Sequence, residues 1–243
     1  PLDAESHYNL GNTFIQLGEL QESVSAYKKA IELNSGYIDA YNNLGVVLRE
    51  LGELDQSKEI YEKIIKLKPD YAEAYNNLGI IFFKTKELND SEISYKKAIE
   101  LNPKYPEAYN NLAITLRELD RLDESIFYHK KAIELKPDYA EAYNNLGVTF
   151  DKSNKLDESE ANYKKAIELK SNYAEAYYNL GIAQRKHGKL EESVSSYKKA
   201  IELKFNYAEA YYNLGIAFKE LGKLEDSETS YKKAIELKPN YPD

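Results

Sequence analysis

The sequence predicts an all-α fold, a solenoid of seven helix–turn–helix repeats of 34 residues each. Three observations lead to this prediction. The phrase Tyr-Lys-Lys-Ala-Ile-Glu-Leu recurs at multiples of 34 residues, and degenerate copies fill the gaps. Apolar residues inside each repeat follow the 3–4 spacing of an amphipathic helix, in two runs. Glycine and proline recur at fixed positions between these runs, as expected for the turns and loops that separate helices.

The repeats account for almost the whole chain of 243 residues. They form one array, residues 4–241, with boundaries at 4–37, 38–71, 72–105, 106–139, 140–173, 174–207 and 208–241. Residues 1–3 and 242–243 are then remnants of flanking repeats, and the opening Pro1-Leu2-Asp3 suggests a segment excised from a longer protein. Positions within a repeat are numbered from 1 below, so that Ala4 occupies position 1 of the first repeat.

Each element of the repeat has its own signal. Positions 4, 7, 8 and 11 form the apolar face of the first helix, and glycine at position 8 predicts close approach of the paired helix. Glycine at position 15 suits the left-handed residue that ends a helix. Positions 17, 20, 24, 27 and 28 form the face of the second helix, which proline at position 32 follows in four repeats. Serine at position 20 is expected to be a small packing residue whose hydroxyl bonds within its own helix.

Composition and charge exclude several functions. The 33 basic and 41 acidic residues give a net charge of −8 without a basic block, so we predict no nucleic acid partner. No apolar run reaches the ~18 residues of a membrane-spanning helix, so we predict no membrane partner. Cysteine is absent, the three histidines fall in three different repeats, and no phosphate-binding glycine loop is present. We therefore expect no enzymatic activity, no catalytic residues, no metal site and no cofactor.

The repeat resembles the tetratricopeptide repeat, and the resemblance covers the whole array. In the third repeat, the residues that match the family consensus are Tyr75, Leu78-Gly79, Phe82, Ser91, Tyr95 and Pro103. The resemblance implies a right-handed superhelix whose first helices line an inner, concave surface through positions 2, 5, 6, 9, 12 and 13. It also implies that this surface binds proteins or peptides.

Asparagine occupies position 6 in every repeat, although it is a mediocre helix former. These candidate peptide-binding residues are Asn9, Asn43, Asn77, Asn111, Asn145, Asn179 and Asn213. A carboxamide both donates and accepts, so it matches one peptide unit of an extended ligand. Position 9 adds an apolar strip, and Ile80, Phe83 and Ile114 form the expected apolar pocket, flanked by Arg49 and Arg117. The alternative is that the asparagines bond locally between adjacent helices.

Two subtypes of the family differ in this surface. The type that grips a C-terminal carboxylate carries basic residues where this chain has Tyr8, Glu73 and Asn77, so that clamp is absent. The array is more similar to that of O-linked N-acetylglucosamine transferase, whose inner surface carries an asparagine ladder. This resemblance covers the array only.

The favoured function is a non-enzymatic scaffold that binds an extended protein or peptide segment in its concave groove. Two alternatives remain: an array that recruits substrates for a larger glycosyltransferase-like enzyme, and an architectural repeat without a groove ligand. The chain stops where an eighth repeat would begin and carries no polar capping helix, so we also expect head-to-tail self-association. In the last repeat this contact is expected to involve Leu214, Phe218, Tyr231 and Ile235.

Overall fold

The computed structural model describes residues 3–239, which form fourteen α-helices and no strand. The helices are α1 Ala4–Leu17, α2 Leu20–Leu33, α3 Ile38–Glu50, α4 Leu54–Leu67, α5 Ala72–Lys84, α6 Leu88–Leu101, α7 Pro106–Glu118, α8 Leu122–Leu135, α9 Ala140–Lys152, α10 Leu156–Leu169, α11 Ala174–Lys186, α12 Leu190–Leu203, α13 Ala208–Glu220 and α14 Leu224–Leu237. The predicted all-α fold of seven helix–turn–helix repeats is confirmed. The remnants at 1–2 and 242–243, and Tyr241, lie outside the described residues.

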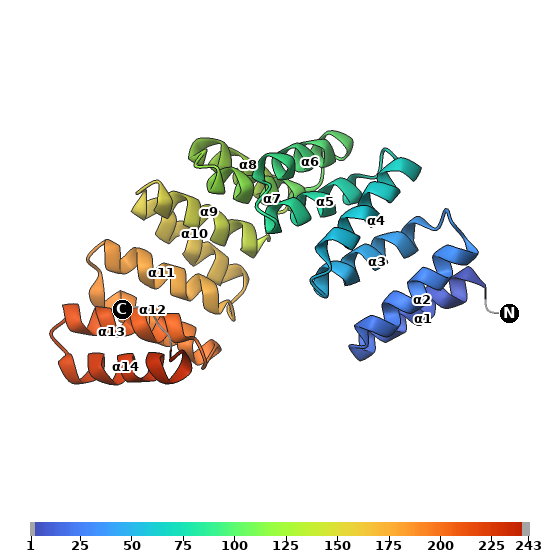
Figure 1. Ribbon diagram of the computed structural model, residues 1–243. Coiled ribbons are helices and arrows are strands. Elements are labelled where there is room, and N and C mark those ends of the chain that lie inside the picture. The colour runs from blue at the N-terminus through green and yellow to red at the C-terminus, as the bar shows by residue number, and fades with distance from the viewer. Residues whose placement is uncertain (1–2, 240–243) are drawn as a thin grey trace. The chain divides into compact units, whose positions relative to one another are not determined.

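By their contacts the helices form two units, which we describe separately. Unit 1 is Pro1–Leu119 and contains α1 to α7, whereas unit 2 is Asp120–Asp243 and contains α8 to α14. Within each unit, the first helix of a repeat packs on the second helix of the same repeat, and that second helix packs on the next first helix (Figure 1). The division falls inside the fourth predicted repeat, after α7.

The glycine at position 8 lies against the tyrosine ring at position 24 of the same repeat. A Cβ placed on Gly147 would lie 2.6 Å from Cε1 of Tyr163, and one placed on Gly45 would lie 2.7 Å from Cζ of Tyr61. These distances are too short for any real side chain contact. The close approach predicted from the glycine is therefore present, and the obstacle is an aromatic ring rather than backbone.

We expect Gly147→Ala to lower the free energy of unfolding by about 1–3 kcal/mol, because the new methyl group overpacks the contact with Tyr163. The fourth repeat carries Ala113 at position 8 and is also the repeat with histidine, His129, at position 24. Gly147→Ala combined with Tyr163→His should therefore cost less than the sum of the two single changes. Chemical denaturation of the four variants measures this coupling. Additive losses would show that the ring is not the obstacle.

The serine at position 20 bonds across the helix pair. The hydroxyls of Ser57, Ser91, Ser159 and Ser227 donate to the carbonyl oxygen of the position-8 glycine of the paired first helix, at 2.7 to 3.0 Å. The expected bond within the serine's own helix is wrong for these four residues. It is present only for Ser193, which donates to the Leu190 carbonyl. The physical reason is the glycine itself, because the absent side chain brings its carbonyl within reach.

Every turn within a repeat contains a left-handed residue at position 15. Glycine occupies it in four repeats, for example Gly18 with a φ of 77°. Lys86, Asp120 and Asn154 take the same conformation, with φ of 68°, 61° and 57°. Because the left-handed region costs an ordinary L-residue about 1–2 kcal/mol, helix packing imposes this turn even where the sequence lacks glycine.

Candidate functional site

Within each unit, the first helices of successive repeats lie side by side. In unit 1 these are α3, α5 and α7, and in unit 2 they are α9, α11 and α13. We call the surface of α3, α5 and α7 that carries positions 6, 9 and 12 the first-helix face of unit 1. It contains most of the candidate residues: Arg49, Asn77, Ile80, Phe83, Asn111, Ile114 and Arg117, together with Asn43.

The position-6 asparagines bond to the preceding repeat. In unit 1, Nδ2 of Asn77 donates to Oδ1 of Asn42 at 3.3 Å, and Nδ2 of Asn111 donates to Oδ1 of Asn76 at 3.2 Å. Asn43 does the same with Oδ1 of Asn12 at 3.0 Å. The local bonding that the sequence left as an alternative is therefore present. Each such bond uses one of the two N–H groups of the amide.

Unit 2 repeats this arrangement with one change of partner. Asn179 donates to Oδ1 of Asn144 at 3.1 Å, whereas Asn213 donates to the hydroxyl of Tyr178 at 3.0 Å. Asn145 is half-buried, and its backbone carbonyl accepts from the Thr149 hydroxyl. The asparagine row thus links neighbouring first helices in both units. Asn9, in the first repeat, is exposed.

The acceptors of the bonds from Asn77, Asn111, Asn179 and Asn213 are position-5 residues, which the resemblance had placed on the groove surface. The acceptor for Asn43 is Asn12, at position 9. Asn76, Asn110 and Asn144 are only 5%, 4% and 1% exposed. Although the resemblance implies that position 5 lines the concave surface, these three residues are buried, because neighbouring first helices close over them. Sequence reasoning missed that positions 5 and 6 of successive repeats are partners. Their constant spacing of 35 residues was the available signal.

A pocket of about 240 Å³ opens on the first-helix face of unit 1. It is lined by Ile80, Phe83, Tyr95, Asn111 and Ile114. The structure thus brings together the three residues that the sequence predicted as an apolar pocket, and adds two polar ones. Tyr95 was assigned to the core from its repeat position and missed as a lining residue. The Tyr95 ring packs against Gly79, so the glycine–tyrosine contact between the two helices of the repeat also forms one wall of the pocket.

The two polar residues of this pocket are uncharged. Burial raises the pKa of the Tyr95 hydroxyl, while a hydrogen bond with Ser91 and the charge of Arg49 act in the opposite direction. The hydroxyl is therefore neutral at ordinary pH. Asn111 contributes a carboxamide whose bond to Asn76 uses only one of its N–H groups. The pocket combines apolar walls with one hydroxyl and one carboxamide.

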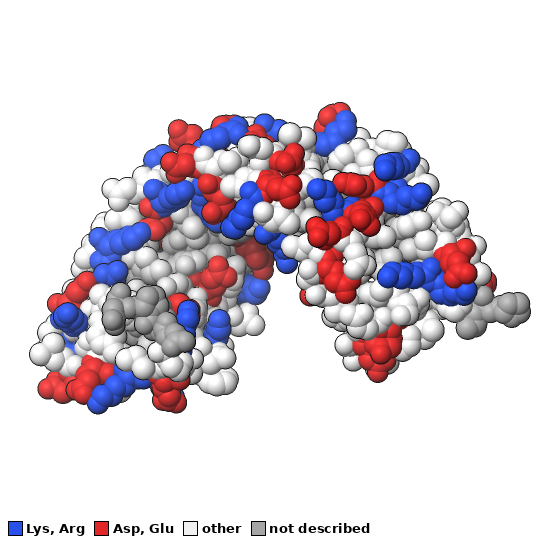
Figure 2. Space-filling model, in the orientation of Figure 1, with Lys and Arg blue, Asp and Glu red and all other residues white. Residues whose placement is uncertain are grey.

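The two arginines that were predicted to flank the pocket make different contacts. Nη1 of Arg49 donates to Oδ1 of Asn77 at 3.1 Å, which fixes the guanidinium beside the asparagine row. Arg117 is largely buried, with a side-chain exposure of 14%, and its Nε lies 3.6 Å from Oε1 of Glu118. Elsewhere both charge signs are interspersed on the side of the molecule shown in Figure 2. The site is therefore apolar, with cationic groups at positions 12 of the flanking repeats.

The histidines do not form a site together. Within residues 3–239 no cluster of three or more acidic or histidine side chains has metal-binding geometry. His187 instead lies 2.9 Å from a buried carboxylate, Glu160, in unit 2. Over the same range no helix is both long and apolar enough to cross a membrane.

Helix pairs that stack so that their first helices share one face define a helical-repeat protein. Models described as tetratricopeptide repeat match residues 72–105, 105–172, 162–194 and 208–241. A further model, described as TPR repeat, matches residues 11–52, 47–86 and 184–222. The chain belongs to the tetratricopeptide repeat family, which supports a role as a protein-interaction scaffold. No curated protein matches the chain significantly.

Several solved structures have a similar fold. The crystal structure of MamA is 26% identical, with a TM-score of 0.60, and covers 69% of this chain and 92% of its own. YrrB, described as a TPR protein with an unusual peptide-binding site, is 24% identical with a TM-score of 0.58, covering 77% of this chain and 96% of its own. PilF of Pseudomonas aeruginosa is 19% identical with a TM-score of 0.74, covering 84% and 93%.

Proposed function

We propose that this chain is a non-enzymatic scaffold that binds an extended peptide segment on its first helices. The observation that carries the proposal is the pocket of about 240 Å³ lined by Ile80, Phe83, Tyr95, Asn111 and Ile114. It lies on the face where the position-6 asparagines are aligned, so one side-chain pocket and a row of amides share one surface. The peptide-binding member YrrB, which has the same fold, supports the proposal.

The pocket favours one apolar side chain of the ligand. Burial of a Leu or Phe side chain contributes about 1.5–3 kcal/mol. In this proposal the remaining N–H of Asn111 and its carbonyl oxygen bond the ligand backbone beside that side chain. Each neutral hydrogen bond adds only about 0.5–1.5 kcal/mol, so the apolar anchor sets the position of the ligand and the amides hold its backbone.

The flanking charges favour acidic residues next to the anchor. Arg49 and Arg117 occupy position 12 on the repeats before and after Phe83. Charges at the edge of a binding surface act mainly on specificity and on the association rate. The preferred ligand is therefore an extended segment with one Leu or Phe residue and acidic neighbours.

The test uses short capped peptides of a Ser/Gly/Ala host that carry Leu, Phe or Ala at the centre and Asp or Lys on both sides. Fluorescence anisotropy with the full chain measures each Kd. We expect Leu or Phe with Asp neighbours to bind most tightly. Ile80→Ala and Ile114→Ala together should weaken that peptide about tenfold, because the walls that cover the anchor are removed. The double change Arg49→Gln and Arg117→Gln should remove the Asp preference while keeping the preference for Leu or Phe.

The controls separate binding from folding. Ile216→Ala truncates the same repeat position in unit 2, away from the pocket, and should leave the Kd unchanged. Replacing Asn77 or Asn111 is a poor test, because their amides also bond the preceding repeat. Thermal unfolding shows whether each variant is folded. Equal binding of all the peptides, or equal weakening by Ile216→Ala, would contradict the proposal.

A further inference from the structure

The turn of the third repeat carries an unusual residue at position 15. Lys86 takes the left-handed conformation there, with a φ of 68°. The other six repeats have glycine, aspartate or asparagine at this position, and these are the residues that adopt the left-handed region most readily. Lysine lacks the short polar side chain that stabilises this conformation locally. The backbone alone therefore does not explain the lysine, and strain of this kind is often found at functional positions.

Lys86 lies beside the pocket on the first-helix face of unit 1. Its Nζ is 5.7 Å from the centroid of the Phe83 ring, within the range of a cation–π contact. Phe83 is one wall of the pocket of about 240 Å³, so a ligand side chain in the pocket would touch the ring that Lys86 contacts. The lysine is exposed, and it forms no ion pair within residues 3–239. Its ammonium is therefore available to a carboxylate of the ligand.

The other charged residue at position 15 shows what a structural role looks like. Asp120 has the same left-handed backbone, and its carboxylate lies 3.0 Å from Nζ of Lys152 within unit 2. Its charge is thus used by the fold, whereas that of Lys86 is not. Arg49 and Arg117, the cations at position 12, are half-buried, whereas Lys86 is exposed. Of the three cations, Lys86 is the most accessible to a ligand.

We propose that Lys86 is a specificity-determining residue of the peptide site, where it binds an acidic side chain two residues from the apolar anchor. This inference rests on the proposed function, because the anchor must fill the pocket. In an extended segment, alternate side chains point to the same face and lie about 6.6 Å apart. A residue two positions from the anchor therefore lies on the same surface, at a distance that the flexible lysine side chain can span.

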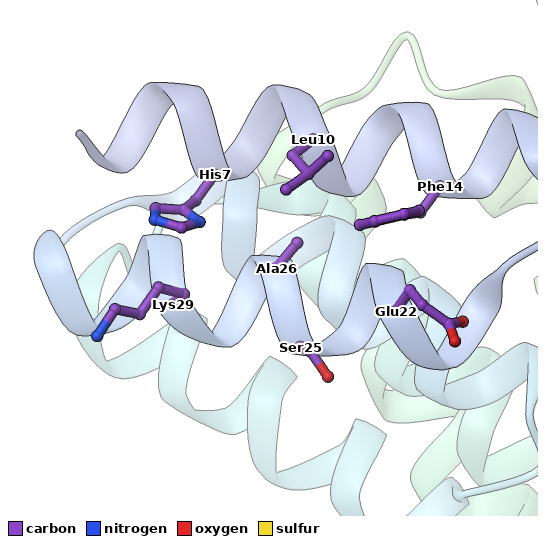
Figure 3. A pocket seen from close by; sticks show the side chains of 7 residues that line it. All are labelled: His7, Leu10, Phe14, Glu22, Ser25, Ala26 and Lys29. Atoms are coloured by element: carbon purple, nitrogen blue, oxygen red, sulfur yellow. The ribbon is translucent and has the colours of Figure 1, made fainter. Parts of the chain in front are cut away.

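The larger pocket of the first repeat offers a competing site of similar composition. Its volume is about 350 Å³, and it is lined by apolar residues together with Lys29. Figure 3 shows Leu10 and Phe14 along α1, with Lys29 on α2. However, Nζ of Lys29 lies 2.8 Å from Oε2 of Glu32, so this cation already has a carboxylate partner. Lys29 is therefore a suitable control for Lys86.

The apolar residues of the last repeat that were expected to take part in self-association offer no open surface. Leu214 and Phe218 are only 5% and 6% exposed. They pack with Tyr197 of α12 from the preceding repeat. The expectation that these two residues are partly uncovered is therefore wrong.

The first experiment exploits the opposite effects of one substitution on stability and on binding. Lys86→Gly removes the strain of the turn, so the midpoint of thermal unfolding should rise by about 2–4 °C. The same change removes the ammonium, so an acidic peptide should bind about two- to fivefold more weakly. Lys86→Gln should weaken binding equally without raising the midpoint. Asn154→Gly is the matched control, because it changes the same position in unit 2 and should leave the affinity unchanged.

The second experiment uses capped Ser/Gly/Ala peptides with a central Leu. Asp stands two residues before the Leu, two residues after it, or at neither place, and fluorescence anisotropy with the full chain measures each Kd. We expect one of the two Asp peptides to bind about two- to fivefold more tightly than the peptide without Asp. Lys86→Gln should remove this difference, whereas Lys29→Gln should leave it intact.

The outcomes separate this inference from the proposed function. Equal Kd values for the three peptides, or an Asp preference that survives in Lys86→Gln, would overturn the role of Lys86. In either case, a central Leu that still binds more tightly than a central Ala would leave the apolar anchor in place. Equal binding of the Leu and Ala peptides would overturn both. A loss of the Asp preference in Lys29→Gln would instead place the peptide in the pocket of the first repeat, which also overturns the role of Lys86.

Discussion

Leu180→Ala is expected to lower the free energy of unfolding by about 2–5 kcal/mol, the usual cost of emptying a leucine site in a packed core. Leu180 is 6% exposed and packs with Tyr163 and Ala183, with Val148 and Ile167 at the edge of the cluster. These residues come from two successive repeats. The leucine therefore holds a junction between repeats, and its loss weakens the coupling between neighbours.

Leu10→Ala is the matched control, since Leu10 occupies the same repeat position but is 39% exposed. Its cost should be much smaller than that of Leu180→Ala. Because each repeat contacts only its neighbours, hydrogen exchange should show the loss around Leu180 concentrated in the fifth to seventh repeats. The sixth repeat has Gln184 where all other repeats carry an apolar residue and His187 where four carry leucine, so it is expected to be the least protected in unit 2. Strongest protection there would contradict this nearest-neighbour description.

Removing the two side chains of the next repeat that contact Glu160 is expected to cost about 3 kcal/mol, because a buried carboxylate would keep only one, weaker partner. Glu160 is 3% exposed, and its carboxylate contacts Nζ of Lys189 at 2.8 Å and Nδ1 of His187 at 2.9 Å. The variant is Lys189→Ala with His187→Ala. Lys164, at 3.3 Å and with 57% of its side chain exposed, remains as the weaker partner.

Adding Glu160→Val to that double variant should restore most of the stability, since an apolar residue of suitable size removes the buried charge. Val24 and Val194 show that valine fits position 21 in other repeats. Chemical denaturation of the double and triple variants measures the difference. A triple variant no more stable than the double one would show that packing, not charge, caused the loss.

The same cluster predicts how stability changes with pH. Burial raises the pKa of Glu160, but bonds from Lys189, His187 and Lys164 outweigh it, so the pKa lies below its ordinary value of 4.5. A carboxyl whose folded pKa is depressed stabilises the fold above the ordinary value, and this contribution is lost as the pH falls through the folded pKa. Wild-type chain should therefore lose this stability below about pH 4.5, and the triple variant should show a smaller loss over that range.

Much of the candidate pocket was predictable from the sequence. Ile80 and Phe83 lie on α5 and Ile114 lies on α7, at repeat positions that the family resemblance assigns to the concave surface. Tyr95 was not predictable as a lining residue, because its repeat position marks it as core. Tyr95 lines the pocket because of the way its ring packs against Gly79, and sequence spacing does not specify that packing.

The position-6 asparagines show a different limit of prediction from sequence. The sequence revealed that position 6 is invariant but left open whether the amide serves a ligand or the fold. The bond from Asn111 to the buried Asn76 answers half of that question, because it commits one N–H group to the preceding repeat. A carboxamide has further donor and acceptor capacity, so this bond is compatible with a second role toward a ligand.

The sequence by itself determined the number of helices, the length of the repeat and the apolar face of each helix, because all of these follow from local periodicity and from glycine and proline at repeated positions. Only the tertiary structure decided which polar groups meet across helices. The serine hydroxyls reach the glycine carbonyls of the paired helix, and Glu160 reaches Lys189 and His187 of the next repeat. It also decided that Lys86 adopts a left-handed turn where glycine is missing. These features depend on distances between helices, which are set by packing over many residues and leave no local signal in the chain.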